Sequence, residues 1–206
     1  STLEPTMVVM LSASLKPVVT RAINPIARGA LRVGLTPNAV TFIGAIGLII
    51  SALYFYPRQE FFIGTLVITF FALSDLFDGA MARISAKGAS KWGGFLDSTI
   101  DRATDSAILI GLILALIDTA DPLLSVALGA LVAGTLVPYI RAKAESLGIE
   151  CSGGIAERTE RLIIALTAIG LEGLGVPYAL AIGVWALFIL AAVTVFQRIR
   201  IVKAAL

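Results

Sequence analysis

Four aspartates stand in the middle of a strongly apolar chain, at spacings that group them in pairs. Asp75 and Asp78 are three residues apart, and Asp97 and Asp101 are four residues apart, so each pair occupies one face of a helix. A carboxylate at membrane depth is costly, and its default interpretation is functional. Four carboxylates around one small volume repel one another, and divalent cations are the simplest compensation. Paired divalent metals serve reactions in which one oxygen attacks phosphorus and another leaves.

The other reactive residue types restrict this chemistry further. The chain has no histidine and one cysteine, Cys151, which excludes an internal disulfide and a cysteine-based metal site. Cys151 is expected to be an ordinary small loop residue. A metal site must be built from oxygen ligands, which favours two Mg²⁺ ions, with Mn²⁺ as a second candidate. The alternative is that the aspartates form membrane-edge salt bridges. We prefer that interpretation only for Asp105, which is expected to pair with Arg102 or with a neighbouring helix.

Small residues and an arginine accompany the aspartates. Gly79 and Ala82 follow the first pair, and Gly93 precedes the second. A residue without a Cβ lets a ligand approach the helix backbone closely, and Arg83 can bind a phosphate bidentately. This combination predicts a site for a metal-bound pyrophosphate, with a flat base lying against the small residues.

The elements that must position these residues are apolar helices. Hydrophobic residues make up 58% of the 206 residues and charged residues 15%, against about 25% charged in an ordinary globular domain. We therefore predict an all-α polytopic membrane protein. Each of six apolar segments has a core near the ~20 residues that cross the hydrocarbon. Their approximate ranges are 38–55, 60–85, 91–117, 122–146, 157–173 and 177–203.

The remaining segments define the topology. Residues 14–35 are typical of an amphipathic helix on the membrane surface that precedes the first span. With the N-terminus inside, the outer loops hold Arg58 and the inner segments hold the other fifteen of the sixteen basic residues. This distribution predicts N-in/C-in and puts the aspartates on the cytoplasmic side. Residues 1–12 are expected to be a linker or tag remnant and an N-terminal tail, and 13–206 a single membrane domain.

The acidic segment also carries a family signature. The string Asp-x2-Asp-Gly-x2-Ala-Arg-x9-Gly-x3-Asp-x3-Asp, which starts at Asp75 and ends at Asp101, resembles that of the CDP-alcohol phosphotransferases. These membrane enzymes transfer a phosphatidyl group from CDP-diacylglycerol to an alcohol and release CMP. The resemblance implies that Asp75, Asp78, Asp97 and Asp101 are metal ligands, that Asp101 is also the catalytic general base, and that the protein is a homodimer. The implied CDP-diacylglycerol pocket consists of Pro37, Asn38, Thr41, Gly79, Ala82, Arg83 and Gly93.

A basic cluster near the fifth span bears on the acceptor alcohol. Arg158 and Arg161 lie one turn apart where that helix begins, and a helix start suits an anion because its free N–H groups point outward. We predict a pocket for an acceptor that carries a phosphate, with a flexible approach through residues 152–154. The alternative is that these basic residues are topology signals that touch anionic lipid head groups. The predicted phosphate ligands are Arg141, Lys143, Arg158, Arg161 and Arg198.

Two longer stretches narrow the choice of acceptor. Residues 24–37 and 140–164 resemble the actinobacterial phosphatidylinositol phosphate synthases, which implies inositol 1-phosphate as acceptor and phosphatidylinositol phosphate as product. A phosphatidylglycerophosphate synthase that uses glycerol 3-phosphate is the alternative within the family. Outside it, intramembrane aspartates are also typical of a divalent-cation transporter. The expected location is the plasma membrane of a bacterium, among membrane lipids, with no nucleic-acid partner and with the active site facing the cytoplasm.

Overall fold

The computed structural model describes residues 23–84, 90–119 and 121–206, and these residues form helices and connections without a strand. The all-α prediction is therefore confirmed. The expected tail at 1–12, and residues 14–22 of the amphipathic segment, lie outside the described residues. After a helical segment at 23–32 come α2 (Pro37–Phe55), a short 3-10 turn (Tyr56–Arg58), α3 (Phe61–Ala72), α4 (Ser74–Ile84), α5 (Lys91–Thr119), α6 (Leu123–Ser146), α7 (Arg158–Gly173) and α8 (Ala179–Ala205).

The helix bounds follow the predicted apolar segments closely, with one difference. The second segment is two helices, because the chain turns at Leu73 between α3 and α4. α4 begins at Ser74, whose hydroxyl lies where a side chain on Gly44 of α2 would be, 1.8 Å from an ideal Cβ there. A glycine at 44 thus lets the start of α4 pack directly against α2.

Within the described ranges, four helical stretches are long and apolar enough to cross a membrane: Pro37–Arg58, Phe61–Ile84, Leu123–Ser146 and Ala179–Ala205. The other two predicted spans fall short of this standard for physical reasons. α5 has ample length but carries Asp97, Asp101 and Arg102 in its first half, and α7 has 16 residues and begins at Arg158. Length and composition therefore support four of the six predicted spans.

The chain divides into two compact units. One comprises residues 1–46 and 71–100, and its core joins the helical segment 23–32 to α4. Ala27 is buried there against Ala80 and Met81. Ile23 packs against the same cluster, whereas Ile26 is exposed, so only one side of this segment is packed. Its predicted place on the membrane surface remains a prediction.

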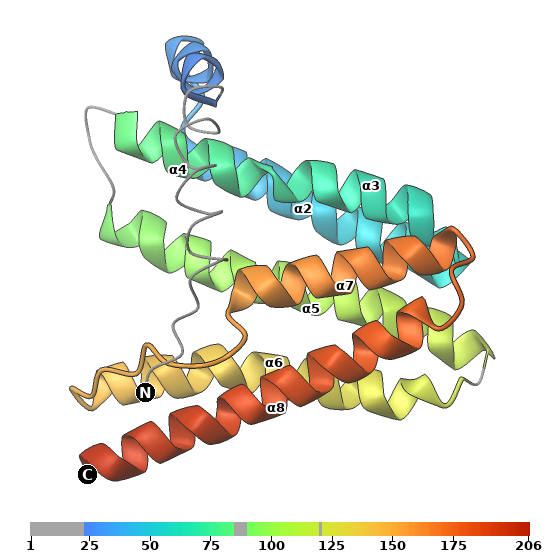
Figure 1. Ribbon diagram of the computed structural model, residues 1–206. Helices are drawn as coiled ribbons and strands as arrows, with labels where there is room; N and C mark the ends of the chain where they lie inside the picture. Colours follow the sequence, from blue (N-terminus) through green and yellow to red (C-terminus); the bar gives the residue numbers. More distant parts are fainter. Residues whose placement is uncertain (1–22, 85–89, 120) are drawn as a thin grey trace, which may run out of the picture. The chain divides into compact units, whose positions relative to one another are not determined.

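The second unit comprises residues 47–70 and 101–206, and α8 is its central element. α6 lies alongside α8 and runs in the same direction, and α7 also packs on α8 (Figure 1). Gly129 of α6 meets the ring of Phe188, because an added Cβ would lie 2.9 Å from it. Gly183 of α8 meets Ala168 of α7 still more closely, at 2.1 Å from an ideal Cβ. Glycine at these positions allows close helix packing, as is common in membrane bundles.

Candidate active site

The start of α2 holds the most buried of the four aspartates. Thr41 and Asp78 are each 7% exposed, and the Thr41 hydroxyl donates a hydrogen bond to Oδ2 of Asp78. The same hydroxyl lies 3.1 Å from the carbonyl oxygen of Pro37. A hydroxyl has one proton, and the charged carboxylate is the stronger acceptor. Thr41 therefore fixes the orientation of Asp78 from a different helix.

The first turn of α5 meets the first turn of α2 within the same unit. Ser90 precedes α5, and its Oγ accepts a hydrogen bond of 2.9 Å from the Gly93 amide, which caps the helix. A Cβ at Gly93 would lie 3.5 Å from Oδ1 of Asn38. The structure therefore brings together Asn38, Gly93, Thr41 and Asp78, four residues that the sequence assigned to nucleotide and metal binding.

Gly79 and Arg83 lie one turn apart on α4. A Cβ at Gly79 would have one close neighbour, Nη1 of Arg83 at 3.6 Å. The guanidinium thus lies over the backbone at Gly79, and the Arg83 side chain itself is exposed. Ala82, on the same helix, is partly buried. This part of α4 therefore presents an open backbone surface with a cation beside it.

Two further aspartates of the first unit act electrostatically on Asp78. The charges of Asp75 and Asp97 both reach the carboxylate of Asp78. Asp75 is half-buried and Asp97 exposed. In the described part of the chain, no three acidic or other ligating side chains are gathered closely enough to enclose a metal ion. The donor set fits a hard divalent cation, because it consists of carboxylates near one another; the side chains would have to turn toward a common point to enclose the ion.

Asp101, one turn after Asp97 on α5, belongs to the second unit and has cationic neighbours. Its Oδ1 lies 2.9 Å from Nη1 of Arg158, the first residue of α7, and its Oδ2 lies 3.7 Å from Arg102. Asp105 shares both arginines, at 3.2 Å from Arg158 and 3.8 Å from Arg102. The expectation that Asp105 pairs with Arg102 or a neighbouring helix is confirmed on both counts. Two carboxylates and two guanidinium groups alternate in this cluster.

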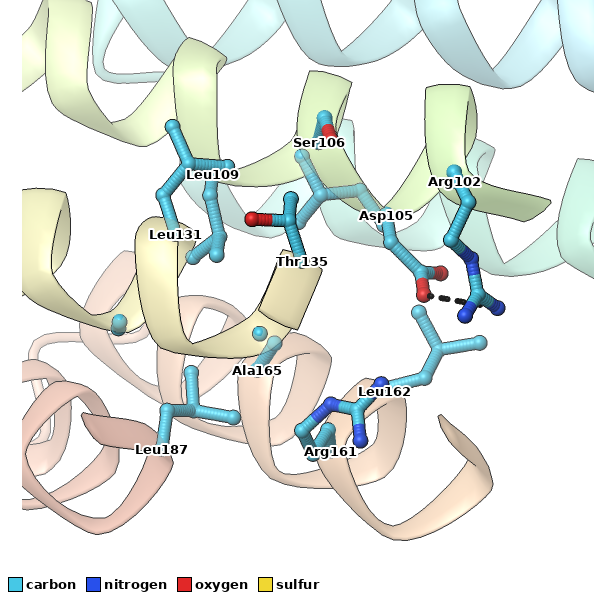
Figure 2. A pocket seen from close by; sticks show the side chains of 13 residues that line it. Arg102, Asp105, Ser106, Leu109, Leu131, Thr135, Arg161, Leu162, Ala165 and Leu187 are labelled. Atoms are coloured by element: carbon cyan, nitrogen blue, oxygen red, sulfur yellow. Dashed lines mark ion pairs between the residues drawn. The ribbon is translucent and has the colours of Figure 1, made fainter. Parts of the chain in front are cut away.

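A pocket opens beside this cluster, between α5, α6, α7 and α8. Figure 2 shows Arg102, Asp105 and Arg161 at one end of it, and the side chains of Leu109, Leu131 and Leu187 around the rest. Arg161 donates a hydrogen bond of 2.9 Å to the carbonyl oxygen of Ala156, which holds the arginine at the start of α7. The pocket thus has a charged mouth and an apolar interior.

Arg198 ties the loop before α7 to the bundle. The side chain is 3% exposed, with Nε 2.8 Å from the carbonyl oxygen of Gly153 and Nη1 2.6 Å from that of Val137. The amide of Ala156 donates to Thr194 at 3.3 Å. Buried hydrogen-bonding groups of α8 thus contact this loop, and the flexible approach through 152–154 stays a prediction. Cys151, in the same loop, is buried.

The structure does not gather all five predicted phosphate ligands. Arg158 and Arg161 lie together at the start of α7, but Arg141 projects outward and pairs with Glu145 at 2.8 Å. Lys143 lines a different groove, between the last turns of α6 and α8. The five predicted ligands therefore divide into a pair at the start of α7, a buried structural arginine and a peripheral pair.

Comparison with known proteins identifies the family. Residues 34–199 match the sequence profile of the CDP-alcohol phosphatidyltransferases. The chain belongs to this family. A phosphatidylinositol phosphate synthase of Streptomyces avermitilis is 41% identical over 203 aligned residues, which cover 94% of this chain and 83% of the relative. The synthase of Mycobacterium tuberculosis strain H37Rv is 41% identical over 187 residues, which cover 88% of this chain and 86% of the relative.

Solved structures agree with this assignment. The crystal structure of the M. tuberculosis phosphatidylinositol phosphate synthase with CDP-DAG bound has a TM-score of 0.83 and 41% identity, over 88% of this chain and 94% of that one. A crystal structure of the same enzyme in complex with manganese and citrate has a TM-score of 0.84 and 40% identity, over 88% of each chain. This CDP-alcohol phosphatidyltransferase is thus an integral membrane enzyme, and the alternative of a cation transporter is set aside.

Arg102 is a site residue that sequence reasoning treated only as a partner for aspartates. In the structure it also lines the pocket with Arg161, and its buried Nε has no hydrogen-bond partner among the described residues. The available signal was its spacing, because a cation three residues before Asp105 lies on the same face of α5 as that aspartate. Nothing in the sequence placed Arg161 on the opposite side of that pocket.

Proposed function

We propose that this CDP-alcohol phosphatidyltransferase transfers the phosphatidyl group of CDP-diacylglycerol to inositol 1-phosphate, giving phosphatidylinositol phosphate and CMP. The observation that carries the proposal is the complete acidic signature, from Asp75 to Asp101, in a chain 41% identical to enzymes named for that product. Arg158 lies beside Asp101 and Arg161 follows one turn later on α7, which supports an acceptor that bears a phosphate.

Asp75, Asp78, Asp97 and Asp101 would hold the metal ions in this proposal. Bound Mg²⁺, or Mn²⁺, would neutralise the charge of the pyrophosphate and of the leaving CMP. The donor set supports this choice, as does the manganese in a related crystal structure. Thr41 donates to one of these carboxylates and fixes its orientation.

The start of α2, the exposed side of α4 and the start of α5 would bind the CDP group. The open backbone at Gly79 and Gly93 gives the nucleotide room to lie close to two helices. Arg83 would donate to a phosphate oxygen from its place over Gly79. The proposed contact residues are Pro37, Asn38, Thr41, Gly79, Ala82, Arg83 and Gly93.

Asp101 would accept the proton of the attacking acceptor hydroxyl as general base. Its neighbours Arg158 and Arg102 orient that carboxylate. We further propose that Arg158 and Arg161 bind the acceptor phosphate directly. Arg198 would contribute by holding the loop before α7, since both of its described hydrogen bonds go to backbone carbonyls.

The membrane arrangement is part of the same proposal. Six spans with both termini inside would expose the acidic site to the cytoplasm, where a soluble sugar phosphate is available. The parallel course of α6 and α8 supports the six-span arrangement. Two spans with a single span between them in the sequence run in the same direction across the membrane. We also propose one membrane domain over 13–206, a homodimer, and the plasma membrane of a bacterium as its location.

Purified protein in liposomes with CDP-diacylglycerol tests the function directly. CMP release should require inositol 1-phosphate and a divalent ion, stop on chelation, and resume with Mg²⁺ or Mn²⁺. CMP release with glycerol 3-phosphate but not with inositol 1-phosphate would show that glycerol 3-phosphate is the acceptor. Both compounds carry a phosphate, so the arginines fit either one. Release that needs neither an acceptor nor a metal would contradict the mechanism.

A further inference from the structure

A groove between the last turns of α6 and α8 has the properties of a lipid site. Tyr139, Lys143 and Leu147 line it from α6, and Ile199, Lys203 and Leu206 from α8. Tyr139, Leu147, Ile199 and Leu206 are all exposed large side chains. Exposed apolar side chains on membrane spans face lipid tails, and the two lysines beside them add a cationic end that suits an anionic head group.

The position of the groove indicates the membrane interface. α6 and α8 both have the length and composition of membrane spans, and they end side by side. Tyrosine is enriched where the hydrocarbon meets the head groups, and lysine extends its ammonium group toward the same level. The two ammonium groups would therefore lie at head-group height.

The charge of the groove selects an anion. Among the described residues that line it are two lysines and no acidic side chain. The pocket beside α7 differs, because Asp105 stands there with its arginines. Other basic residues on these two helix ends are engaged elsewhere, since Arg141 pairs with Glu145 and Arg200 lies 6.0 Å from the ring of Phe196.

An apolar track continues from the groove along the same faces. Leu128, Val132 and Leu136 of α6, with Phe188 and Val195 of α8, line it. At 1.5 Å per residue, Val132 lies roughly 16 Å along the helix from Lys143, about half the ~30 Å hydrocarbon thickness of a bilayer. That is the depth to which one leaflet's acyl chains reach.

We infer that this α6/α8 groove binds one anionic phospholipid, with its head-group phosphate between Lys143 and Lys203 and an acyl chain along the apolar track. This site is separate from the proposed reaction, and it favours the lipid-contact alternative for Lys143 over acceptor binding. Lysine suits the task because its compact charge attracts a phosphate without requiring one fixed geometry.

Native mass spectrometry of the full-length protein in detergent, titrated with phosphatidylglycerol or phosphatidylcholine, tests the inference. Wild type should prefer phosphatidylglycerol, and K143Q/K203Q should bind it roughly 30-fold more weakly, about fivefold for each lysine. The matched control R141Q/R200Q removes two charges from the same helix ends outside the groove and should change binding less than about twofold. K143R/K203R should restore binding, which excludes misfolding as the cause.

Several outcomes would overturn the inference. Equal losses in the lysine and arginine pairs would indicate general surface charge. Displacement of the lipid by excess inorganic phosphate would indicate a free-anion site. A change in the ratio of dimer to monomer in K143Q/K203Q, with lipid retention unchanged, would assign the groove to a second copy of the chain.

Discussion

Nη1 of Arg158 lies 2.9 Å from Oδ1 of Asp101, and the two residues come from the start of α7 and the first half of α5. The pair joins the last aspartate of the acidic signature to the first cation of the proposed acceptor site. Asp105 shares Arg158 but lies outside the signature, so the two aspartates can be compared as matched neighbours.

D101N should abolish transfer to the acceptor, with kcat falling by about 10²–10⁴-fold, the usual contribution of a positioned general base. D105N removes a carboxylate from the same arginines but should lower kcat by less than about tenfold. CMP release in liposomes at saturating CDP-diacylglycerol and acceptor measures both. Equal losses of kcat in the two variants would contradict the general-base role. They would indicate that both carboxylates act only by holding the arginines in place.

T41V should weaken Mg²⁺ binding, and so raise the Mg²⁺ concentration that the enzyme needs, without removing a metal ligand. Valine keeps the shape of threonine but leaves the buried Asp78 carboxylate without its Thr41 donor. Loss of such an outer partner costs about 10–100-fold in metal affinity or activity. The readout is the Mg²⁺ concentration that gives half-maximal CMP release. T69V is the control, because the Thr69 hydroxyl bonds the carbonyl oxygen of Thr65 on its own helix, and it should leave the Mg²⁺ dependence unchanged.

G183A should destabilise the packing of α7 on α8. Its Cβ would lie 2.1 Å from that of Ala168, and overpacking of this kind costs about 1–3 kcal/mol. G134A on α6 meets nothing within 4 Å and should be neutral or stabilising by up to about 1 kcal/mol, since alanine favours the helix. Thermal unfolding in detergent measures both. The two substitutions should therefore shift Tm in opposite directions, or only G183A should lower it.

R198M should loosen the loop before α7. Methionine cannot donate to the carbonyl oxygens of Gly153 and Val137, and each buried group left unsatisfied costs about 1–3 kcal/mol. Hydrogen exchange at the Ala156 amide, now bonded to Thr194, should become faster. R200M removes an exposed arginine from the same helix and should leave that exchange rate unchanged. An unaltered rate in R198M would mean that Thr194 and Gln197 suffice to hold the loop.

The lengths of the apolar segments predicted the helices well because span length is fixed by the bilayer. The ends of α6 and α7 lie within a residue of the prediction. The turn at Leu73 was missed, since leucine there continues the apolar run and carries no turn signal. The acidic residues could be singled out in the sequence because polar groups stand out in an apolar background.

The basic residues were harder to assign. An arginine that signals topology, one that holds the fold together and one that binds a phosphate look the same in the sequence. Only tertiary packing distinguishes these roles. Arg198 is buried against two backbone carbonyls, whereas Arg141 forms a surface pair within its own helix. No spacing along the sequence encodes that difference, because the partners are 45 and 61 residues away in one case and four in the other.

The shared direction of α6 and α8 has a practical consequence for mapping sidedness. A reporter fused after Leu206 and a tag inserted at Gly148 should be accessible from the same compartment, while one inserted at Gly175, beyond the other end of α7, should be accessible only from the opposite compartment. Cys151, the sole native thiol, is 1% exposed, so new cysteines at these places could be labelled against a low background.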